Sequence, residues 1–261
     1  MRVGGQFTRG LWVLLALVLA PVSAMAGPFS NWAVVVISGD YHAHGDVETD
    51  AFDNARRDVS AALVARGGFS ATNIRQFSAR PEHFDAPRPG SDSFDEIVTV
   101  LHQLTRTATA GCLIYISSHG APYGVQLGQT ILPPAELANA LGGACGQRPT
   151  IIVVSACFSG VFVPMLAGAN RMILTAARPD RTSFGCGVDN TYPYFDDCFL
   201  QSIAISSNFI DLGPRVVSCV AARETSEGMA PPSEPQVWID PEFTPLLQRS
   251  RFGAPPGRRR R

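Results

Sequence analysis

Four short apolar runs rich in β-branched residues recur along the chain and predict buried strands. They lie at residues 33–38, 112–117, 150–154 and 171–176. Continuous apolar runs of this length are typical of strands that are covered on both faces, as in parallel sheets. A shorter strand is predicted at residues 73–77.

Stretches with apolar residues three or four positions apart separate these runs and predict helices. The helices are expected at residues 52–66, 93–104, 134–141 and 194–205. Glycine pairs after the first and third of these helices are expected to end them. A further segment, residues 215–220, fits either a last strand or the end of a helical region. Strands that alternate with helices predict an α/β fold with a mainly parallel sheet.

The first 26 residues have the three parts of a secretory signal peptide. Arg2 and Arg9 are basic, residues 11–20 are apolar, and small residues stand at Ala24 and Ala26. The apolar run is short for a membrane span, and no later segment approaches the required length. We expect cleavage near Ala26 and a periplasmic or secreted protein; the alternative is an uncleaved N-terminal anchor.

The rest of the chain is long enough for one sizeable domain with a buried core. We predict this domain at residues 27–240, followed at 241–261 by a flexible tail rich in Pro, Gly and Arg. The formal net charge of −1 gives no sign of a nucleic-acid binder. After removal of the signal peptide, no membrane association is expected, and the sequence does not reveal the oligomeric state.

Two predicted strands are followed by side chains with catalytic potential. His119 and Gly120 come after the strand at 112–117, and Cys157 comes after the strand at 150–154. If these strands are parallel neighbours, both side chains project from the same edge of the sheet, where ligands bind. A histidine can take up the thiol proton and return it to a leaving amine. The backbone N–H groups of Gly120 and Cys157 are candidates for an oxyanion hole.

Each of these motifs alone is more typical of a structural position, and only their joint placement indicates chemistry. Ser-His-Gly after one apolar strand, and Ser-Ala-Cys-Phe-Ser-Gly after the next, resemble the legumain family of cysteine peptidases, which is related to caspases. Residues 174–178, 182–186 and 194–197 extend the resemblance. It runs from about Val34 to Arg223 and is nearer to exported bacterial members than to the plant and animal enzymes.

The resemblance implies a caspase-like three-layer sandwich, in which helices flank a mainly parallel sheet. It implies a cysteine-type endopeptidase with His119 and Cys157 as the catalytic dyad and Gly120 in the oxyanion hole. Peptides or proteins would be the substrates, and neither a cofactor nor a metal is required.

The resemblance also implies a substrate pocket. Asp197 and Ser183 match an acidic residue and a serine of the family members that cut after Asn. Ser155 stands where the plant and animal enzymes have a glutamate.

The arginine and histidine of that pocket have no counterpart here, because Phe52 and Asp53 are nearest to their positions. The residue that supports the catalytic histidine in those enzymes falls near Asp50. A pocket with Asp197 and Asp53 but no arginine fits a basic residue before the cut, whereas the family preference is Asn or Asp. Both remain open at this stage.

Six cysteines follow residue 26, and export permits disulfides. If Cys157 is kept for catalysis, five remain and allow at most two intramolecular bridges. Cys186 and Cys198 flank a short polar segment, while Cys112 and Cys145 each precede a predicted strand. We predict the bridges Cys186–Cys198 and Cys112–Cys145, which leaves Cys219 over.

Three activities fit these observations. The nucleophile does not reveal whether water or an amine resolves the acyl-enzyme, so a transpeptidase or amidase competes with a peptidase. A catalytically silent binding module with the same fold is a third alternative. The presence of His119, Gly120 and Cys157 together favours an enzyme, because binding alone needs none of the three.

Overall fold

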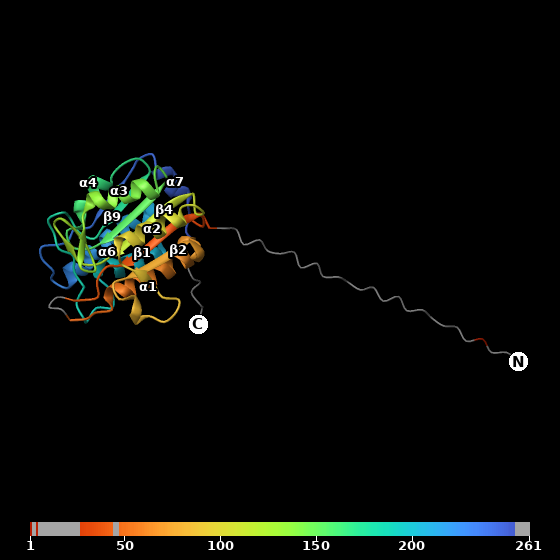
Figure 1. The fold of residues 1–261 in the computed structure, drawn as a ribbon, viewed down its shortest axis with the longest axis horizontal. Coiled ribbons are helices and arrows are strands. Elements are labelled where there is room, and N and C mark those ends of the chain that lie inside the picture. The colour runs from red at the N-terminus through yellow and green to blue at the C-terminus, as the bar shows by residue number, and fades with distance from the viewer. Residues whose placement is uncertain (2–3, 5–26, 44–46, 254–261) are drawn as a thin grey trace.

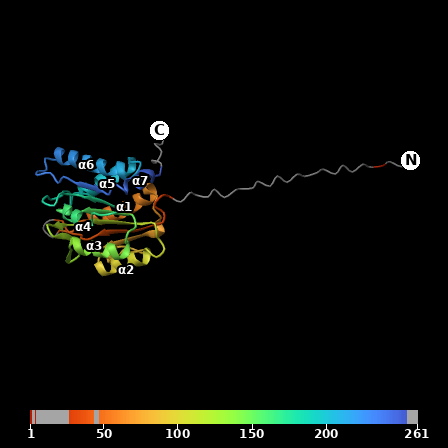
Figure 2. The ribbon, with the colours of Figure 1, turned by 90° about the horizontal axis from the view of Figure 1, so that it is seen from above.

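The computed structural model describes residues 1, 4, 27–43 and 47–253. A seven-stranded sheet lies at its centre, and helices cover both faces (Figures 1 and 2). The predicted signal peptide, apart from residues 1 and 4, lies outside the described residues. The continuous description of the fold begins at Gly27.

The central sheet has the strand order β10-β9-β8-β4-β1-β2-β3. Its strands are β1 (Trp32–Ser38), β2 (Ile74–Ser78), β3 (Gly90–Ser91), β4 (Gly111–Ser117), β8 (Thr150–Ser155), β9 (Arg171–Thr175) and β10 (Gln236–Ile239). All neighbours are parallel except β10, which runs antiparallel to β9. The apolar runs form β1, β4 and β8, and every residue of these three strands is buried. The predicted parallel sheet is confirmed.

The helices form two outer layers on either side of this sheet (Figure 2). One layer contains α1 (Ala51–Ala62), a π-helical turn (Leu63–Gly67), α5 (Tyr194–Ile205), α6 (Phe209–Ser226) and α7 (Thr244–Arg249). The other contains α2 (Phe94–Leu104), α3 (Pro134–Ala144) and α4 (Val163–Leu166). Residues 215–220 lie inside α6, so the strand alternative was wrong. Within the described part of the chain, no helix is long and apolar enough to cross a membrane.

A small antiparallel sheet follows directly after His119. It consists of β5 (Gly120–Ala121), β6 (Gly124–Leu127) and β7 (Thr130–Leu132). Single turns of 3-10 helix connect other elements at Ala71–Asn73, Pro81–His83 and Ser159–Phe162. The Gln126 N–H of β6 donates to the His119 carbonyl at 2.9 Å. This hydrogen bond joins the small sheet to the edge of the central sheet on which the candidate dyad lies.

The folded domain continues beyond the boundary predicted at residue 240. Phe243 and Leu247, four positions apart around the start of α7, are buried in the core together with Phe252. The Gly253 N–H donates to the Arg66 carbonyl at 2.8 Å. Apolar spacing therefore anchors the chain to residue 253, which corrects the tail predicted to begin at 241. Residues 254–261 lie outside the described residues.

Two disulfides cross-link the domain. Cys112–Cys145 is confirmed, with 6.2 Å between the Cα atoms. Cys198 bonds Cys219 instead of Cys186, because α5 and α6 pack together and bring these two Cα atoms to 5.6 Å. The predicted Cys186–Cys198 bridge was therefore wrong. Sequence proximity suggested it, whereas the packing of two helices determined the pair.

Candidate active site

His119 and Cys157 lie just beyond the ends of two neighbouring parallel strands. Ser117 of β4 pairs with Ser155 of β8, and His119 and Cys157 each stand two residues after these partners in the sequence. The Ser118 N–H makes a further contact with the Ser155 carbonyl at 3.0 Å. Equal steps from a shared register bring the two side chains to the same edge of the sheet.

A backbone carbonyl orients the His119 ring. Its Nε2 atom lies 2.8 Å from the His42 carbonyl oxygen, and Phe52 packs edge-on against the ring at 5.1 Å. A carbonyl oxygen can only accept, so Nε2 carries the proton of this contact. In a neutral ring, Nδ1 then carries no proton.

Asp40 shapes the loop that supplies this carbonyl. Its Oδ1 atom accepts from the backbone N–H groups of Tyr41 at 2.6 Å and of His42 at 3.0 Å, and it lies 2.9 Å from His42 Nδ1. The support predicted near Asp50 is therefore provided by His42. Asp50 instead forms an ion pair with Arg80.

Three atoms of Ser183 contact the sulfur of Cys157. Its backbone N–H donates to Cys157 Sγ at 3.3 Å, and its carbonyl and hydroxyl oxygens both lie 3.6 Å from the sulfur. Cys157 is followed by Phe158 in a left-handed conformation, with φ of 57°. This sharp turn ends the strand direction and leaves the Cys157 side chain half-buried at the edge of the sheet.

Gly120 makes a close approach that only glycine allows. A Cβ atom added here would overlap the Cys157 carbonyl oxygen and would lie 3.0 Å from the Ala156 Cβ. The backbones after the two strands therefore touch at this point. The requirement for glycine follows from the tertiary contact between β5 and the turn at Cys157.

We expect Gly120→Ala to lower kcat/KM at least about 100-fold and the free energy of unfolding by about 1–3 kcal/mol, because backbone atoms must move apart. Peptide hydrolysis and urea unfolding measure the two effects. Gly142→Ala is the matched control, since a Cβ there has open space in α3. Equal activity of the two variants would contradict the close-approach argument.

Asp53, predicted for the substrate pocket, is buried beneath β1 and β2. Its Oδ1 atom accepts from Ser38 Oγ at 2.7 Å and from Ser78 Oγ at 2.9 Å. Arg56 and Arg80 form ion pairs with the same carboxylate at 3.0 and 3.1 Å. Asp53 therefore faces the interior.

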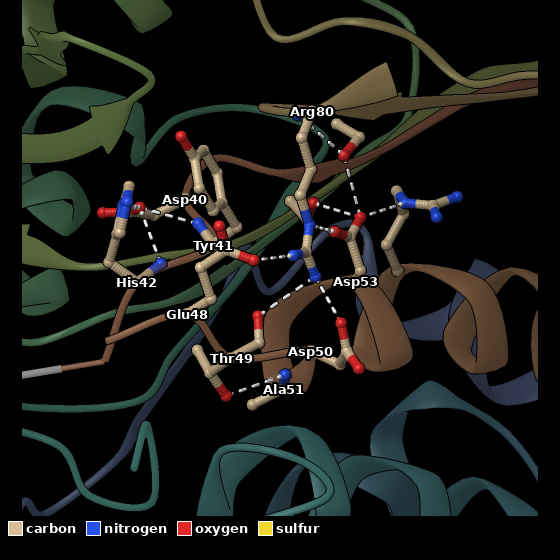
Figure 3. Close-up of polar contacts among 12 residues, drawn as sticks. Asp40, Tyr41, His42, Glu48, Thr49, Asp50, Ala51, Asp53 and Arg80 are labelled. Carbon is tan, nitrogen blue, oxygen red and sulfur yellow. Dashed lines mark hydrogen bonds and ion pairs between the residues drawn. The ribbon is translucent and has the colours of Figure 1, made fainter. Parts of the chain in front are cut away.

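Arg80 lies at the centre of this network (Figure 3). Besides Asp53, its guanidinium contacts Glu48 at 3.4 Å, the Thr49 carbonyl at 3.2 Å and the Asp50 carboxylate. These contacts tie residues 48–50 to the end of β2. The same loop begins at Asp40 and His42, so Arg80 anchors the far end of the segment that orients His119.

The other two candidates of the pocket, Ser155 and Asp197, differ in environment. Ser155 is buried and donates to Asp196 at 2.8 Å. Asp197 is about a quarter exposed, at 27%, and its Oδ2 atom lies 2.5 Å from Arg223 Nη1. Arg223 also lies over the Tyr194 ring at 3.9 Å. The structure thus places Ser183 at Cys157 and supplies Asp197 with an arginine from α6.

Burial raises the pKa of Asp196 to about 6, although hydrogen bonds from Tyr115, Ser117 and Ser155 favour the carboxylate. A carboxyl group whose pKa is higher in the folded than in the unfolded state stabilises the fold when protonated. That contribution is complete below pH 3.8 and is lost as the pH rises through about 6. A shift of about two units corresponds to roughly 3 kcal/mol.

We therefore expect wild type to lose roughly 3 kcal/mol of stability relative to Asp196→Asn as the pH rises from 4 to 8. Urea unfolding of both proteins at several pH values measures this difference, and the variant cancels the other titrating groups. A stability difference that stays constant over this range would refute the assignment.

Sequence reasoning missed a row of serines that crosses four strands. Ser38, Ser78, Ser117 and Ser155 are register partners on β1, β2, β4 and β8. The residues two positions further along are Asp40, Arg80, His119 and Cys157, respectively. The signal was present, because each of these four strands ends on its serine. Asp196 and Arg223 had no comparable signal.

Comparisons with known proteins bear on the family and the fold. A model of the Peptidase C13 family matches residues 98–213, which include both dyad candidates, Ser183 and Asp197. Caspase-1 from Spodoptera frugiperda is similar in structure, with a TM-score of 0.58 and 14% identity over 82% of this chain and 88% of that one. No curated protein matches in sequence. The predicted caspase-like fold is confirmed.

Proposed function

We propose that this chain, a legumain-like cysteine peptidase by its family match and caspase-like fold, hydrolyses peptide bonds with Cys157 as nucleophile and His119 as acid and base. One observation carries the assignment of these residues. Both side chains stand two positions beyond Ser117 and Ser155, which are register partners on adjacent strands.

In this mechanism, the Cys157 thiolate attacks the carbonyl carbon of the scissile bond. The N–H groups of Gly120 and Cys157 stabilise the charge that develops on the carbonyl oxygen. Protonated His119 donates its Nδ1 proton to the leaving amine, and a thioester remains on Cys157. Neutral His119 then takes a proton from water, which attacks the thioester and releases the new carboxyl terminus and the thiolate.

Two contacts support these roles. The His42 carbonyl holds the Nε2 proton of His119, so Nδ1 is the nitrogen that exchanges a proton. The Ser183 N–H donates to the Cys157 sulfur at 3.3 Å and holds it in place. No cofactor or metal takes part in the proposed steps.

We infer that the residue before the cut contacts Asp197 and Ser183. Of the two specificities left open by the sequence, the ion pair of Asp197 with Arg223 favours Asn. A carboxamide offers both a donor and an acceptor to such a pair, whereas a basic residue would meet a carboxylate that is already neutralised. Asp53 and Ser155 are buried, so we propose that neither contacts the substrate.

A peptide-library cleavage profile of wild type beside Cys157→Ala tests this proposal. We expect cleavage after Asn by wild type and none by Cys157→Ala. Arg223→Leu should move the preference toward basic residues, while Arg215→Leu, an exposed arginine of the same helix, should not. Equal cleavage by wild type and Cys157→Ala would refute the role of the nucleophile.

The same acyl-enzyme could be resolved by an amine, which is the transpeptidase or amidase alternative. Adding a peptide amine and analysing the products by mass spectrometry separates hydrolysis from ligation. We expect hydrolysis to dominate. Failure of an electrophilic substrate analogue to label Cys157 in the folded protein would instead favour the silent binding module.

We also propose that the protein acts outside the cytoplasm, in the periplasm or after secretion. The two disulfides support this, since such bridges persist in oxidising compartments. Peptide or protein substrates are the expected partners.

A further inference from the structure

Asp196 lies beneath the edge of the sheet that carries the dyad. It belongs to the first turn of α5 and is fully buried. Its Oδ1 atom accepts from Tyr115 Oη at 2.5 Å. Its Oδ2 atom accepts from Ser117 Oγ at 2.7 Å and from Ser155 Oγ at 2.8 Å. A single oxygen thus joins the last residues of two adjacent strands.

The strands joined in this way are those that end in the dyad. His119 and Cys157 stand two residues beyond Ser117 and Ser155 and follow the last paired residues of β4 and β8. The separation of the two strand ends determines how the His119 imidazole faces the Cys157 thiol. A carboxylate oxygen with two short hydrogen bonds is a rigid link for such a purpose.

Asp196 also connects this edge to the segment around the sulfur. The Tyr194 N–H, at the start of α5, donates to the Phe184 carbonyl at 3.0 Å. Phe184 follows Ser183, whose N–H contacts Cys157 Sγ. The anchored first turn of α5 therefore holds both the strand ends and the wall of the nucleophile.

The fold contains a second clamp of the same design, which provides an internal comparison. One oxygen of Asp53 accepts from Ser38 and Ser78, the serines of the other adjacent strand pair in the row. That clamp lies beneath Asp40 and Arg80 and does not lie on the strands of the dyad. Burying a carboxylate costs free energy, so packing alone does not account for either clamp.

We propose that Asp196 is a positioning residue for hydrolysis, because its Oδ2 atom sets the separation of the strand ends that carry His119 and Cys157. This inference rests on the proposed function. Asp196 touches neither substrate nor reacting atoms, and it acts through Ser117 and Ser155. Loss of the link should lower the rate of the chemical step and leave substrate binding nearly unchanged.

The test compares kcat and KM of Asp196→Asn, of Ser117→Ala/Ser155→Ala and of the variant that combines all three changes. We expect the first two to lower kcat at least about 10-fold with KM within about twofold, since they break the same link. The combined variant should fall little further. Thermal unfolding checks that each variant is folded. If Asp196→Asn does not fold, the serine double variant tests the link in its place.

Two control variants separate positioning from stability. Tyr115→Phe removes the bond to the other oxygen of the same carboxylate, and Ser78→Ala removes a serine from the second clamp. Both should lower thermal stability but keep kcat within about twofold of wild type. Equal loss of kcat in the controls and in Asp196→Asn would overturn the proposal, as would an unchanged kcat in Asp196→Asn.

The rate of Cys157 alkylation by iodoacetamide, measured from pH 5 to 9, provides a readout that needs no peptide. We expect slower alkylation at neutral pH in Asp196→Asn and in the serine double variant, but not in the controls. If wild type cleaves no peptide, the proposed function fails, and these alkylation rates alone decide on Asp196. Identical pH profiles in wild type and Asp196→Asn would then overturn the positioning role.

Discussion

Replacing His119 with alanine is expected to lower kcat/KM by about 10³–10⁴-fold, with a similar loss for Cys157→Ala. Without the imidazole, the thiol loses its proton acceptor and the leaving amine loses its proton donor. The double variant should be little worse than either single one, because the two residues act as one unit. Initial rates on a cleaved peptide measure all three losses.

His102→Ala is the matched control for this series, because His102 is an exposed histidine in the last turn of α2. We expect wild-type rates from it. Losses that multiply in the double variant, instead of saturating, would mean that His119 and Cys157 contribute independently. The dyad would then be the wrong description.

Arg80→Met is expected to lower the free energy of unfolding by about 3–5 kcal/mol, the usual effect of breaking a buried ion pair. The Arg80 side chain is 5% exposed and pairs with Asp53, which is also 5% exposed. Removing the guanidinium leaves that carboxylate with Arg56 as its remaining ion-pair partner and releases residues 48–50 (Figure 3). Urea unfolding at pH 7 measures the loss.

Arg75→Met provides the comparison, because Arg75 lies on β2, the strand that precedes Arg80, is exposed and donates to carbonyl groups of its own segment. Its expected effect lies within about 0.5 kcal/mol. Adding Asp53→Asn to Arg80→Met should lower the stability further, since the buried Arg56 guanidinium then loses its ion-pair partner. A loss as small as that of Arg75→Met would show that the network contributes little.

The strands, and the sheet edge on which His119 and Cys157 lie, were predictable because local pattern determines them. Apolar runs without polar alternation require burial on both faces, and parallel strands present their carboxyl ends at one edge. His119 and Cys157 follow such runs directly, so the pattern that positions the strands also positions these side chains. The helix at Tyr194–Ile205 was predicted with its observed bounds.

The supports of the site could not be predicted in the same way. Asp196 and Asp197 are neighbours in the sequence, yet one is buried against three hydroxyl groups and the other pairs with Arg223 from a different helix. The rotation and packing of α5 decide this difference. Cys198 bonds Cys219 for the same reason: the packing of α5 against α6 determines which thiols lie within bonding distance.

The sequence by itself determined the layered α/β order, the parallel strands and the sheet edge on which a cysteine and a histidine both lie. Each of these follows from short-range periodicity and from the residues that directly follow a strand. Only the tertiary structure decided which side chains hold that edge together. His42, Asp196 and Arg223 come from segments separated along the chain, and their contacts depend on how helices and loops pack on the finished sheet.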